Sequence, residues 1–384
     1  MSNLWERVRG RAVEIHDAAN LESRLARGEK LRIKLGLDPT APDLHVGHLV
    51  VLDTLRMFQD AGHTIVLIIG DHTALIGDPS GRSETRPVLS PEQVEANAKT
   101  YFDQAYLVLD GERTEVRHNS EWLGVMGAAD ILRLLGKQTL QQVLQREDFA
   151  NRMRDGNPIG AHEILYPFNQ AYDSVAVRAD LEIGGTDQLF NLLFGREIQR
   201  AYGQPAQDVA VFPLLEGTDG TQKMSKSLAN YIGIAEAPEE IYGKVMSLPD
   251  TLTGKYLRLV SDLSAAEQAD LLARGPRDAK AGLAERLVSR LHGAEAARHA
   301  QEDFDRRFRR REMPEEIEER NLTATDAVSA LVELGLAASR GEARRLCDQG
   351  GVKVDGVKVG PEHELRDGVV LQVGKRRFVR VRVK

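Results

Sequence analysis

Two histidines, His45 and His48, lie three residues apart where an apolar strand ending near Leu37 gives way to a helix. At that spacing both imidazoles share one face of the helix's first turn. Gly47, between them, lets a flat ligand approach the backbone closely, and a helix N-terminus favours phosphate. The pattern predicts a cradle for a nucleoside triphosphate. Two surface histidines on an ordinary turn are the alternative that so short a motif leaves open.

A second group of polar residues follows the apolar run at 64–70. Asp78 could pair with a ligand ammonium group, while Arg82 and Arg86 could reach phosphates. The same Asp-Pro-Ser-Gly segment is also typical of an ordinary turn.

Two lysines, Lys223 and Lys226, lie on a loop that follows Gly217-Thr-Asp-Gly220. Cations three residues apart, with hydroxyls such as that of Ser227 beside them, suit a pyrophosphate leaving group. A solvated surface loop is the alternative.

Tyr166, Gln170 and Asp173 recur at positions i, i+4 and i+7, so they share one face of a predicted helix. Burying a hydroxyl, an amide and a carboxylate there is costly unless polar groups meet them. Those groups could belong to a ligand or to neighbouring helices.

The segment from Glu182 to Gln188 reads as a strand that ends in Gly184 and Gly185. A ligand can approach the backbone at these glycines, and Asp187 can accept hydrogen bonds from ribose hydroxyls. Capping the next helix is an equally good use of that aspartate.

These segments fall on a predicted α/β framework. Strand, helix and strand follow one another within about forty residues, which is a βαβ unit of a parallel sheet, and ligands bind beyond the carboxyl ends of such strands. Residues 1–228 are therefore expected to form a Rossmann-like domain, with one helix over 5–30 and an inserted helical segment at about 92–165. The expected strands are 31–37, 64–70, 181–184 and 209–215.

The rest of the chain predicts two smaller domains. Residues 229–312 are expected to form a helical domain, which reads as helical throughout from Pro238 to Arg311. Residues 313–325 read as a linker, and 326–384 as a small α+β domain with two helices and a hairpin at Asp355-Gly356. Cations at polar positions of this last domain suit an RNA surface. They are Arg340, Arg344, Arg345, Lys353 and Lys358.

The charge distribution and the cysteine content of the chain limit the functions that it could have. The chain of 384 residues carries a formal charge of −7, but residues 340–384 hold twelve Lys and Arg against six Asp and Glu. A basic tail on an acidic body suggests that one end meets a polyanion. The single cysteine, Cys347, excludes internal disulfides and thiolate metal cages, and no metal site is expected. Without an apolar run of membrane-spanning length or a signal peptide, we expect a cytoplasmic protein that contacts no membrane.

Taken together and in this order, the motifs resemble class I aminoacyl-tRNA synthetases. His45-Val-Gly-His48 in the first strand-to-helix turn and Lys223-Met-Ser-Lys-Ser227 after the last strand carry the resemblance. The segments at 166–173 and 184–188 resemble the tyrosyl branch in particular. The tail from about Thr325 is similar to the ribosomal S-four-type RNA-binding domain of bacterial tyrosyl enzymes.

The resemblance implies ATP-dependent activation of L-tyrosine, with Mg²⁺ carried by ATP, and transfer of the tyrosyl group to tRNA(Tyr). It also implies a homodimer whose interface comes from the inserted helical segment. Residues implied in phosphate and leaving-group chemistry are Thr40, His45, His48, Arg82, Arg86, Gln188, Lys223 and Lys226. Residues implied around adenosine are Gly36, Asp38, Gly47, Gly185, Asp187 and Ser227. Residues implied around tyrosine are Asp78, Tyr166 and Gln170 for the ammonium group and Asp173 for the phenol.

The sequence departs from that family at Lys34, where many tyrosyl enzymes carry a tyrosine that contacts the phenol. Either Lys34 turns away and another group completes the pocket, or this branch recognises the phenol mainly through Asp173. A tryptophan-specific relative, a catalytically inactive RNA-binding paralogue and a free-standing nucleotidyltransferase are the rival interpretations.

Overall fold

The structure, a computed structural model, describes residues 2–39, 43–79, 90–309, 317–374 and 377–383. It divides into two compact units, Met1–Ala297 and Arg298–Lys384. Three residues of the predicted site, Thr40, Arg82 and Arg86, lie outside the described residues, so their roles stay predictions.

Among the described residues of the first unit, six strands form one sheet in the order β1-β6-β5-β2-β3-β4. All neighbours pair in parallel except β1, which runs antiparallel to β6. The expectation of a Rossmann-like parallel sheet is confirmed. The strands are β1 (Glu14–His16), β2 (Arg32–Leu37), β3 (Thr64–Ile69), β4 (Thr114–His118), β5 (Leu181–Gly185) and β6 (Asp208–Phe212).

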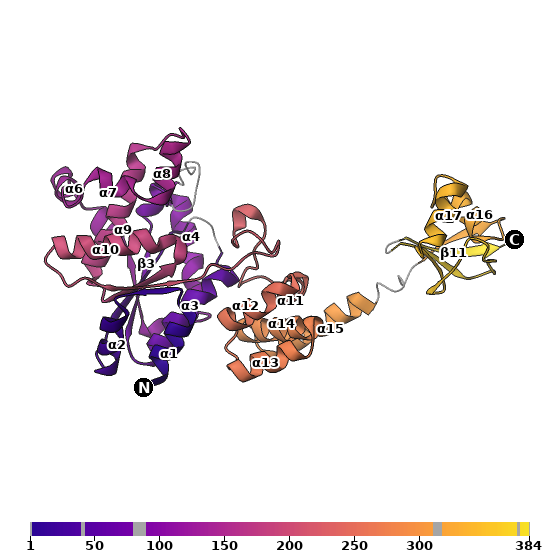
Figure 1. Ribbon diagram of the computed structural model, residues 1–384, viewed down its shortest axis with the longest axis horizontal. Helices are drawn as coiled ribbons and strands as arrows, with labels where there is room; N and C mark the ends of the chain where they lie inside the picture. The colour runs from indigo at the N-terminus through magenta and orange to yellow at the C-terminus, as the bar shows by residue number, and fades with distance from the viewer. Residues whose placement is uncertain (1, 40–42, 80–89, 310–316, 375–376, 384) are drawn as a thin grey trace. The chain divides into compact units, whose positions relative to one another are not determined.

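Helices cover both faces of this sheet, which is why its central strands are apolar almost throughout. Figure 1 shows α9 (Leu165–Val177) and α10 (Leu189–Ala201) on one face. On the other lie α1 (Ser2–Arg11), α2 (Ala18–Ala26) and α3 (Val46–Asp60). The strand order reverses between β2 and β5, so a crevice is expected at the carboxyl ends of those two strands.

The structure corrects two expectations for this unit. Residues 5–30 do not form one helix, because the short strand β1 separates α1 from α2 and pairs with β6 as the edge strand of the sheet. The segment 92–165 is not purely helical either, since β4 lies within it and pairs with β3. This strand reads poorly in the sequence because it is polar and only half-buried. Around it lie α4 (Pro91–Ala105), α5 (Ser120–Leu123), α6 (Ala128–Leu135), α7 (Leu140–Leu144) and α8 (Glu147–Arg154).

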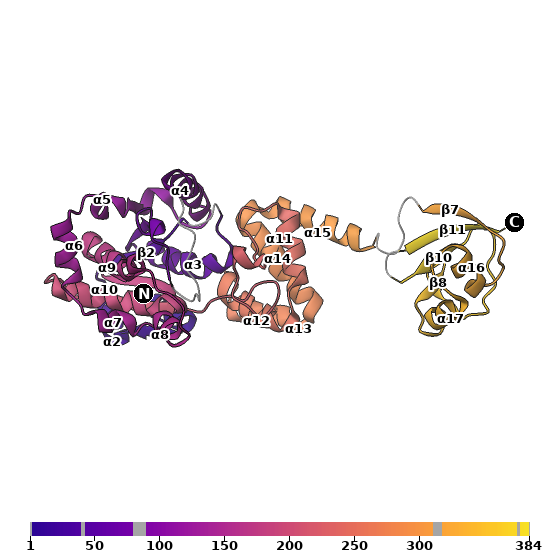
Figure 2. The same cartoon turned by 90° about the horizontal axis from the view of Figure 1, so that it is seen from above.

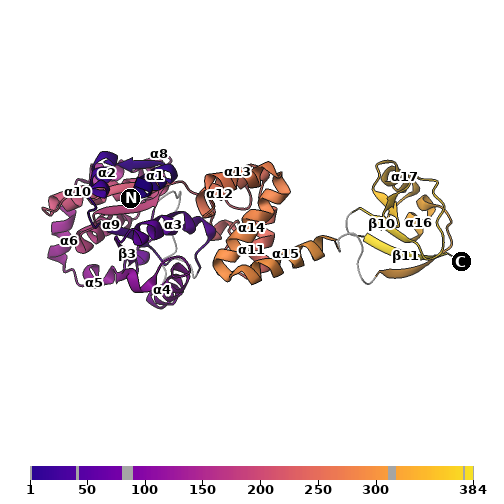
Figure 3. The same cartoon turned by 90° about the horizontal axis from the view of Figure 1, so that it is seen from below.

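The described residues from Pro238 to Arg309 are mainly helical, and Figure 3 shows α11 to α14 gathered into a bundle. Its predicted apolar stripe, from Leu283 to Leu291, is buried. Arg290 ties the bundle to α3 through a 2.5 Å ion pair with Asp53. The helices are α11 (Pro238–Ser247), α12 (Asp250–Val260), α13 (Ala265–Ala273), α14 (Pro276–His292) and α15 (Ala294–Arg309). No helix among the described residues has the length and apolar character needed to cross a membrane.

The second unit is a small α+β domain, as predicted (Figure 2). Its described part contains a five-stranded sheet in the order β7-β11-β10-β8-β9. The predicted hairpin is confirmed, with Asp355 and Gly356 at positive φ in its turn. The elements are β7 (Glu318–Leu322), α16 (Ala327–Glu333), α17 (Arg340–Asp348), β8 (Val352–Val354), β9 (Val357–Lys358), β10 (Val370–Val373) and β11 (Arg377–Val383).

The linker predicted at 313–325 is wrong in part, because β7 lies inside it and pairs in parallel with β11. The sequence Glu-Glu-Arg-Asn-Leu hides this strand, since only Leu322 is buried. What holds the strand is its backbone ladder and the ion pair of Glu319 with Arg382.

Candidate active site

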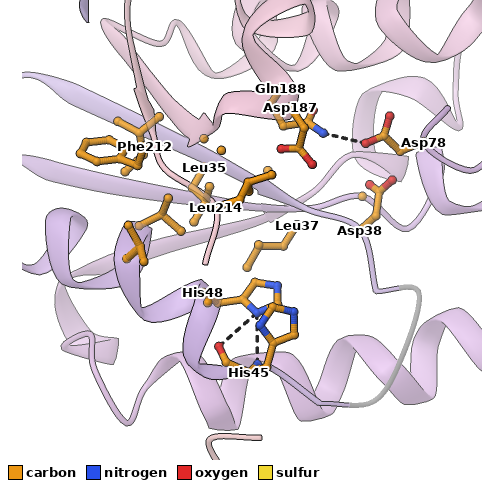
Figure 4. A pocket seen from close by; sticks show the side chains of 18 of the residues that line it. Leu35, Leu37, Asp38, His45, His48, Asp78, Asp187, Gln188, Phe212 and Leu214 are labelled. Carbon is orange, nitrogen blue, oxygen red and sulfur yellow. Dashed lines mark hydrogen bonds between the residues drawn. The ribbon is translucent and has the colours of Figure 1, made fainter. Parts of the chain in front are cut away.

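A cavity of about 990 Å³ opens at the carboxyl ends of β2, β5 and β6, where the strand order reverses. Figure 4 shows the two histidines on one side of it and the carboxylates of Asp38, Asp78 and Asp187 on the other. Every described residue of the predicted catalytic, adenosine and tyrosine sets lines this one cavity. They are Gly36, Asp38, His45, Gly47, His48, Asp78, Tyr166, Gln170, Asp173, Gly185, Asp187, Gln188, Lys223, Lys226 and Ser227.

His45 and His48 are neutral imidazoles at the start of α3. Burial is the largest cause that lowers both pKa values, well below the usual 6.5 for His45 and to about 4 for His48. His48 Nδ1 lies 3.1 Å from the backbone nitrogen of His45 and 3.3 Å from its carbonyl oxygen. When Nδ1 accepts the backbone N–H, the ring proton lies on Nε2. Nδ1 of His45 is buried without a hydrogen-bond partner among the described residues. The pair can therefore donate hydrogen bonds without carrying charge.

Gly47 leaves room for the side chain of His45 in addition to any room it leaves for a ligand. A Cβ atom at this position would lie 2.9 Å from Nδ1 of His45, so the imidazole ring itself occupies part of the predicted open space. At Gly36, by contrast, nothing lies within 4 Å of the place that a Cβ atom would take. The room for a flat ring is therefore beside Gly36.

Lys226 brings a cation to the histidines. Burial lowers its pKa, although Asp43, 3.8 Å away, opposes the effect. Its charge is among the causes that lower the pKa values of both His45 and His48, and its Nζ has no hydrogen-bond partner within the described chain. An ammonium group beside two neutral imidazoles is an arrangement that suits an anion.

Lys223 reaches the opposite side of the cavity, where its Nζ lies 3.2 Å from Asp187. The loop that carries both lysines is held from beneath by Asn230, which is buried. Its Oδ1 accepts the backbone N–H of Ser225 at 2.7 Å, and its Nδ2 donates to Asp219 at 2.6 Å. On the same loop, the hydroxyls of Ser225 and Ser227 lie 2.8 Å apart.

Asp38 and Tyr166 form one polar wall. The Tyr166 hydroxyl donates to Asp38 Oδ2 at 2.9 Å, and Thr73 donates to Oδ1 at 2.8 Å. Burial raises the pKa of Tyr166 well above 10, so the phenol stays a donor. Gly70 makes the arrangement possible, because a Cβ atom there would overlap Asp38.

Asp78 and Gln188 meet although they are far apart in the sequence. Gln188 Nε2 donates to Asp78 at 2.7 Å, and the buried Arg146 lies 3.3 Å from the same carboxylate. Arg146 also donates to Asn191 at 2.9 Å. The carboxylate predicted to bind an ammonium group is thus oriented by a fixed set of donors.

Asp173 lines the cavity and is buried in polar contacts. Trp122 Nε1 donates to Oδ1 at 2.8 Å and Asn119 Nδ2 to Oδ2 at 3.3 Å. Burial raises its pKa to about 7, against the opposing charge of Lys34. Nearby, Gln170 Oε1 is buried without a partner among the described residues.

Lys34 turns away from the cavity, which is the first of the two alternatives that the sequence left open. It does not line the cavity, and its buried Nζ lies 2.8 Å from Glu182 and from Ser174 Oγ. Among the described residues, no group of three or more His, Cys, Asp or Glu side chains could hold a metal ion.

Sequence reasoning missed several residues that shape the site, namely Thr73, Asn119, Trp122, Arg146 and Asn230. None belongs to a short motif. Their only signal is that each is a polar side chain in an otherwise apolar or helical stretch, where burial demands a partner.

The cations predicted to bind RNA lie on α17 and on the hairpin of the second unit. Arg344, Arg345 and Lys358 are exposed, and Lys353 lies directly opposite Lys358 across the hairpin. Two like charges on facing positions destabilise a hairpin unless an anion meets them. Their contact with RNA stays a prediction.

Comparisons with known proteins agree with this geometry. A family model described as tRNA synthetases class I (W and Y) matches residues 26–309, and one described as S4 domain matches 328–371. The tyrosine–tRNA ligase of Bordetella avium is 51% identical over 378 residues, which are 96% of this chain and 92% of that protein. That of Thermotoga maritima is 50% identical over 388 residues, with 96% and 94% covered.

Among solved structures, a C-terminally truncated mitochondrial tyrosyl-tRNA synthetase of Aspergillus nidulans shares the fold, with a TM-score of 0.68 at 22% identity. The match covers 80% of this chain and 95% of that one. The family model spans well over half of the chain, and the bacterial relatives cover nearly all of it. The chain belongs to the tyrosine–tRNA ligase family of the class I tRNA synthetases.

Proposed function

We propose that this protein activates L-tyrosine with ATP and transfers the tyrosyl group to tRNA(Tyr). The observation that carries the proposal is the convergence of unpartnered buried groups on one cavity. His45 Nδ1, Lys226 Nζ and Gln170 Oε1 are all buried there without a hydrogen-bond partner among the described residues. Leaving such groups unsatisfied is costly, and a ligand with phosphates at one end and an ammonium group at the other relieves the cost.

In the first step the tyrosine carboxylate attacks the α-phosphorus of ATP, and the bond from that phosphorus to the bridging oxygen breaks to release pyrophosphate. The step needs no enzyme nucleophile, so positioning and charge stabilisation supply the catalysis. His48, through Nε2–H, His45 and Lys226 face the departing phosphates. When the ribose replaces Lys223 as the partner of Asp187, Lys223 is free to approach the phosphates from the opposite side of the site. Gln188 holds the reacting carboxylate or the α-phosphate. Thr40, Arg82 and Arg86 are proposed as further phosphate ligands.

The adenosine end lies beside Gly36 and Gly47, with Asp38, Gly185, Asp187 and Ser227 around it. Gly185 is needed for this, because a Cβ atom there would lie 2.7 Å from Asp187 Oδ1. The tyrosine end is formed by Asp78, Tyr166 and Gln170 at the ammonium group and by Asp173 at the phenol.

Mg²⁺ is proposed to enter with ATP and to neutralise part of the phosphate charge. The donors at the phosphate end are imidazoles and an ammonium group, which do not suit Mg²⁺. Its ligands would therefore come from phosphate oxygens and water.

The second step needs tRNA, which we propose binds in part to the S4-type domain. The test uses the full chain with Arg344, Arg345 and Lys358 replaced by Glu. We expect unchanged tyrosine-dependent pyrophosphate exchange, tRNA charging at least tenfold weaker, and a smaller dependence of charging on salt. Wild-type charging by this variant would contradict an RNA role for the patch.

A homodimer is proposed through the segment that contains α5, α6 and α7. Apolar side chains are exposed there in a cluster along the chain, with Val125 79% and Leu132 69% exposed, and with Ile131 and Leu140 beside them in sequence. Exposed apolar groups in this density favour a protein partner. By sedimentation, Leu132→Asp should give monomers, whereas Leu272→Asp on α13, also at an exposed leucine, should not. We place the protein in the cytoplasm, where its substrates occur.

The reaction itself is tested by amino-acid-dependent exchange of pyrophosphate into ATP, run with each amino acid in turn. Tyrosine alone should give a signal. Exchange with tryptophan would indicate the tryptophan-specific alternative, and no exchange with any amino acid would indicate an inactive RNA-binding paralogue.

A further inference from the structure

A buried ion pair adjoins the cavity: Glu182 is among the residues that line it, and Lys34 pairs with Glu182 without lining it. Lys34 on β2 and Glu182 on β5 are register partners in adjacent parallel strands, and both side chains point toward α9. Lys34 is completely buried, Glu182 is 1% exposed, and their charged atoms lie 2.8 Å apart. Burying such a pair stabilises a fold little, because desolvation offsets the attraction. A role beyond stability is therefore worth seeking.

All three hydrogens of the Lys34 ammonium group are used within the protein. They meet Glu182 Oε1 at 2.8 Å, Ser174 Oγ at 2.8 Å and the main-chain oxygen of Gln170 at 3.0 Å. An ammonium group has three donors and no acceptor. Lys34 thus has none left for a substrate, and any effect on tyrosine must pass through its neighbours.

Those neighbours flank the residue at the phenol end. Gln170 and Ser174 lie one turn apart on α9, and Asp173 lies between them in sequence. Glu182 adds further hydrogen bonds to this turn of α9, because its Oε2 accepts from Ser174 at 3.1 Å and also from Gln207 at 2.5 Å. The pair therefore fixes the turn of α9 that carries both Gln170 and Asp173 to the cavity.

The same pair supplies charges that act on Asp173. Lys34 from β2 favours the ionised form of the Asp173 side chain, and Glu182 from β5 opposes it more weakly. On the α5 side, Trp122 and Asn119 contribute neutral donors. The cation thus offsets part of the cost of burying a carboxylate.

We propose that the Lys34–Glu182 pair is a specificity-determining element of the tyrosine pocket, which fixes the turn of α9 that carries Asp173 and sets the charge beside this acceptor for the phenol hydroxyl. Both residues act as positioning residues, since neither donates to the substrate. The proposal rests on the proposed role of Asp173 in binding the phenol.

The test compares Lys34→Met/Glu182→Gln, which removes both charges, with wild type in tyrosine-dependent pyrophosphate exchange between about pH 5.5 and 9. Asp173 has a pKa of about 7 in wild type. A rise by one unit would leave about a tenth of it ionised at pH 7 instead of half, so kcat/KM for tyrosine should fall about fivefold and recover near pH 9. The acidic limb of the pH profile should move upward, while kcat at saturating tyrosine changes little.

Lys34→Met alone should move the acidic limb of the pH profile further upward than the double variant does, because the Glu182 anion remains and raises the pKa of Asp173. If this single variant does not fold, the double variant still decides the question. Arg152→Met/Glu163→Gln is the matched control, since Arg152 and Glu163 form another buried ion pair, 2.6 Å apart, that does not line the cavity. It should leave the pH profile unchanged.

Asp173→Asn separates this inference from the role on which it rests. If Asp173→Asn lowers discrimination against phenylalanine while the double variant keeps the wild-type pH limb and discrimination, the ion pair is structural and the inference fails. If Asp173→Asn itself leaves discrimination unchanged, the phenol role of Asp173 fails as well.

Discussion

Replacing His48 with alanine tests whether a neutral imidazole stabilises the transition state of tyrosine activation. With a pKa of about 4, His48 is uncharged at neutral pH, and in the tautomer in which Nδ1 accepts from His45, Nε2–H is the ring donor left for a ligand. Loss of one such donor costs about 3 kcal/mol in the transition state, which corresponds to roughly a hundredfold slower adenylate formation. Tyrosine affinity should change little, because the amino acid is proposed to bind at the other end of the cavity.

The assay is single-turnover formation of tyrosyl-adenylate, with tyrosine binding measured separately. Because the low pKa keeps the ring neutral, the wild-type rate should not depend on His48 titration between about pH 6 and 8. His63→Ala is a matched control, since His63 is also a buried histidine with a pKa of about 4 whose Nδ1 accepts a backbone N–H, but it does not line the cavity. A rate within a few-fold of wild type for His48→Ala would refute the reasoning, as would an equal loss for His63→Ala.

Three further substitutions test other parts of the site. Asp173→Asn should reduce discrimination between tyrosine and phenylalanine by orders of magnitude. In the folded protein Asp173 has a pKa of about 7, above the usual 3.8, so the wild-type protein loses stability as the pH rises from about 4 to 7. The asparagine variant does not ionise there, so it should have a higher melting temperature than wild type at pH 8 but not at pH 4. Lys223→Ala should leave stability within about 1 kcal/mol, since its pair with Asp187 is largely exposed, yet should slow activation severely in the exchange assay. Asn230→Ala should lower kcat with little effect on the KM for tyrosine, because it releases the loop at Ser225; an unchanged kcat would show that the loop needs no anchor.

The parts of the fold that the sequence predicted are those whose burial is complete. The strands at 64–69 and 208–212 are covered on both faces, so their apolar runs are unbroken. The strands missed at the edges of the two sheets are β1, β4 and β7, where polar residues face solvent on at least one side. Two interior strands of the second sheet, β10 and β11, were not predicted either. Edge strands are held by backbone hydrogen bonds to a neighbouring strand that lies elsewhere in the sequence. The pattern of apolar and polar residues within the edge strand itself therefore does not reveal it.

In the candidate site, too, some residues could be predicted from local sequence and others could not. Motif residues such as His45 and Asp187 were predicted because their chemistry depends on spacing within a few positions. The partners of Asp173 and Asp78 were not, since Trp122 and Arg146 approach them from elements about 50 and 70 residues away along the chain. The polarity of a carboxylate demands a partner but does not specify which one.

Pairing of β7 with β11 joins the first and last strands of the second unit, and β11 also pairs with β10. Residues 377–383 therefore form an interior strand of this sheet. During synthesis the ribosome adds this strand after the other four described strands of the sheet, so the sheet cannot close until residues 377–383 have left the exit tunnel. A premature stop before residue 377 would leave β7 and β10 with open edges and would abolish this domain as a folded unit, rather than shorten it.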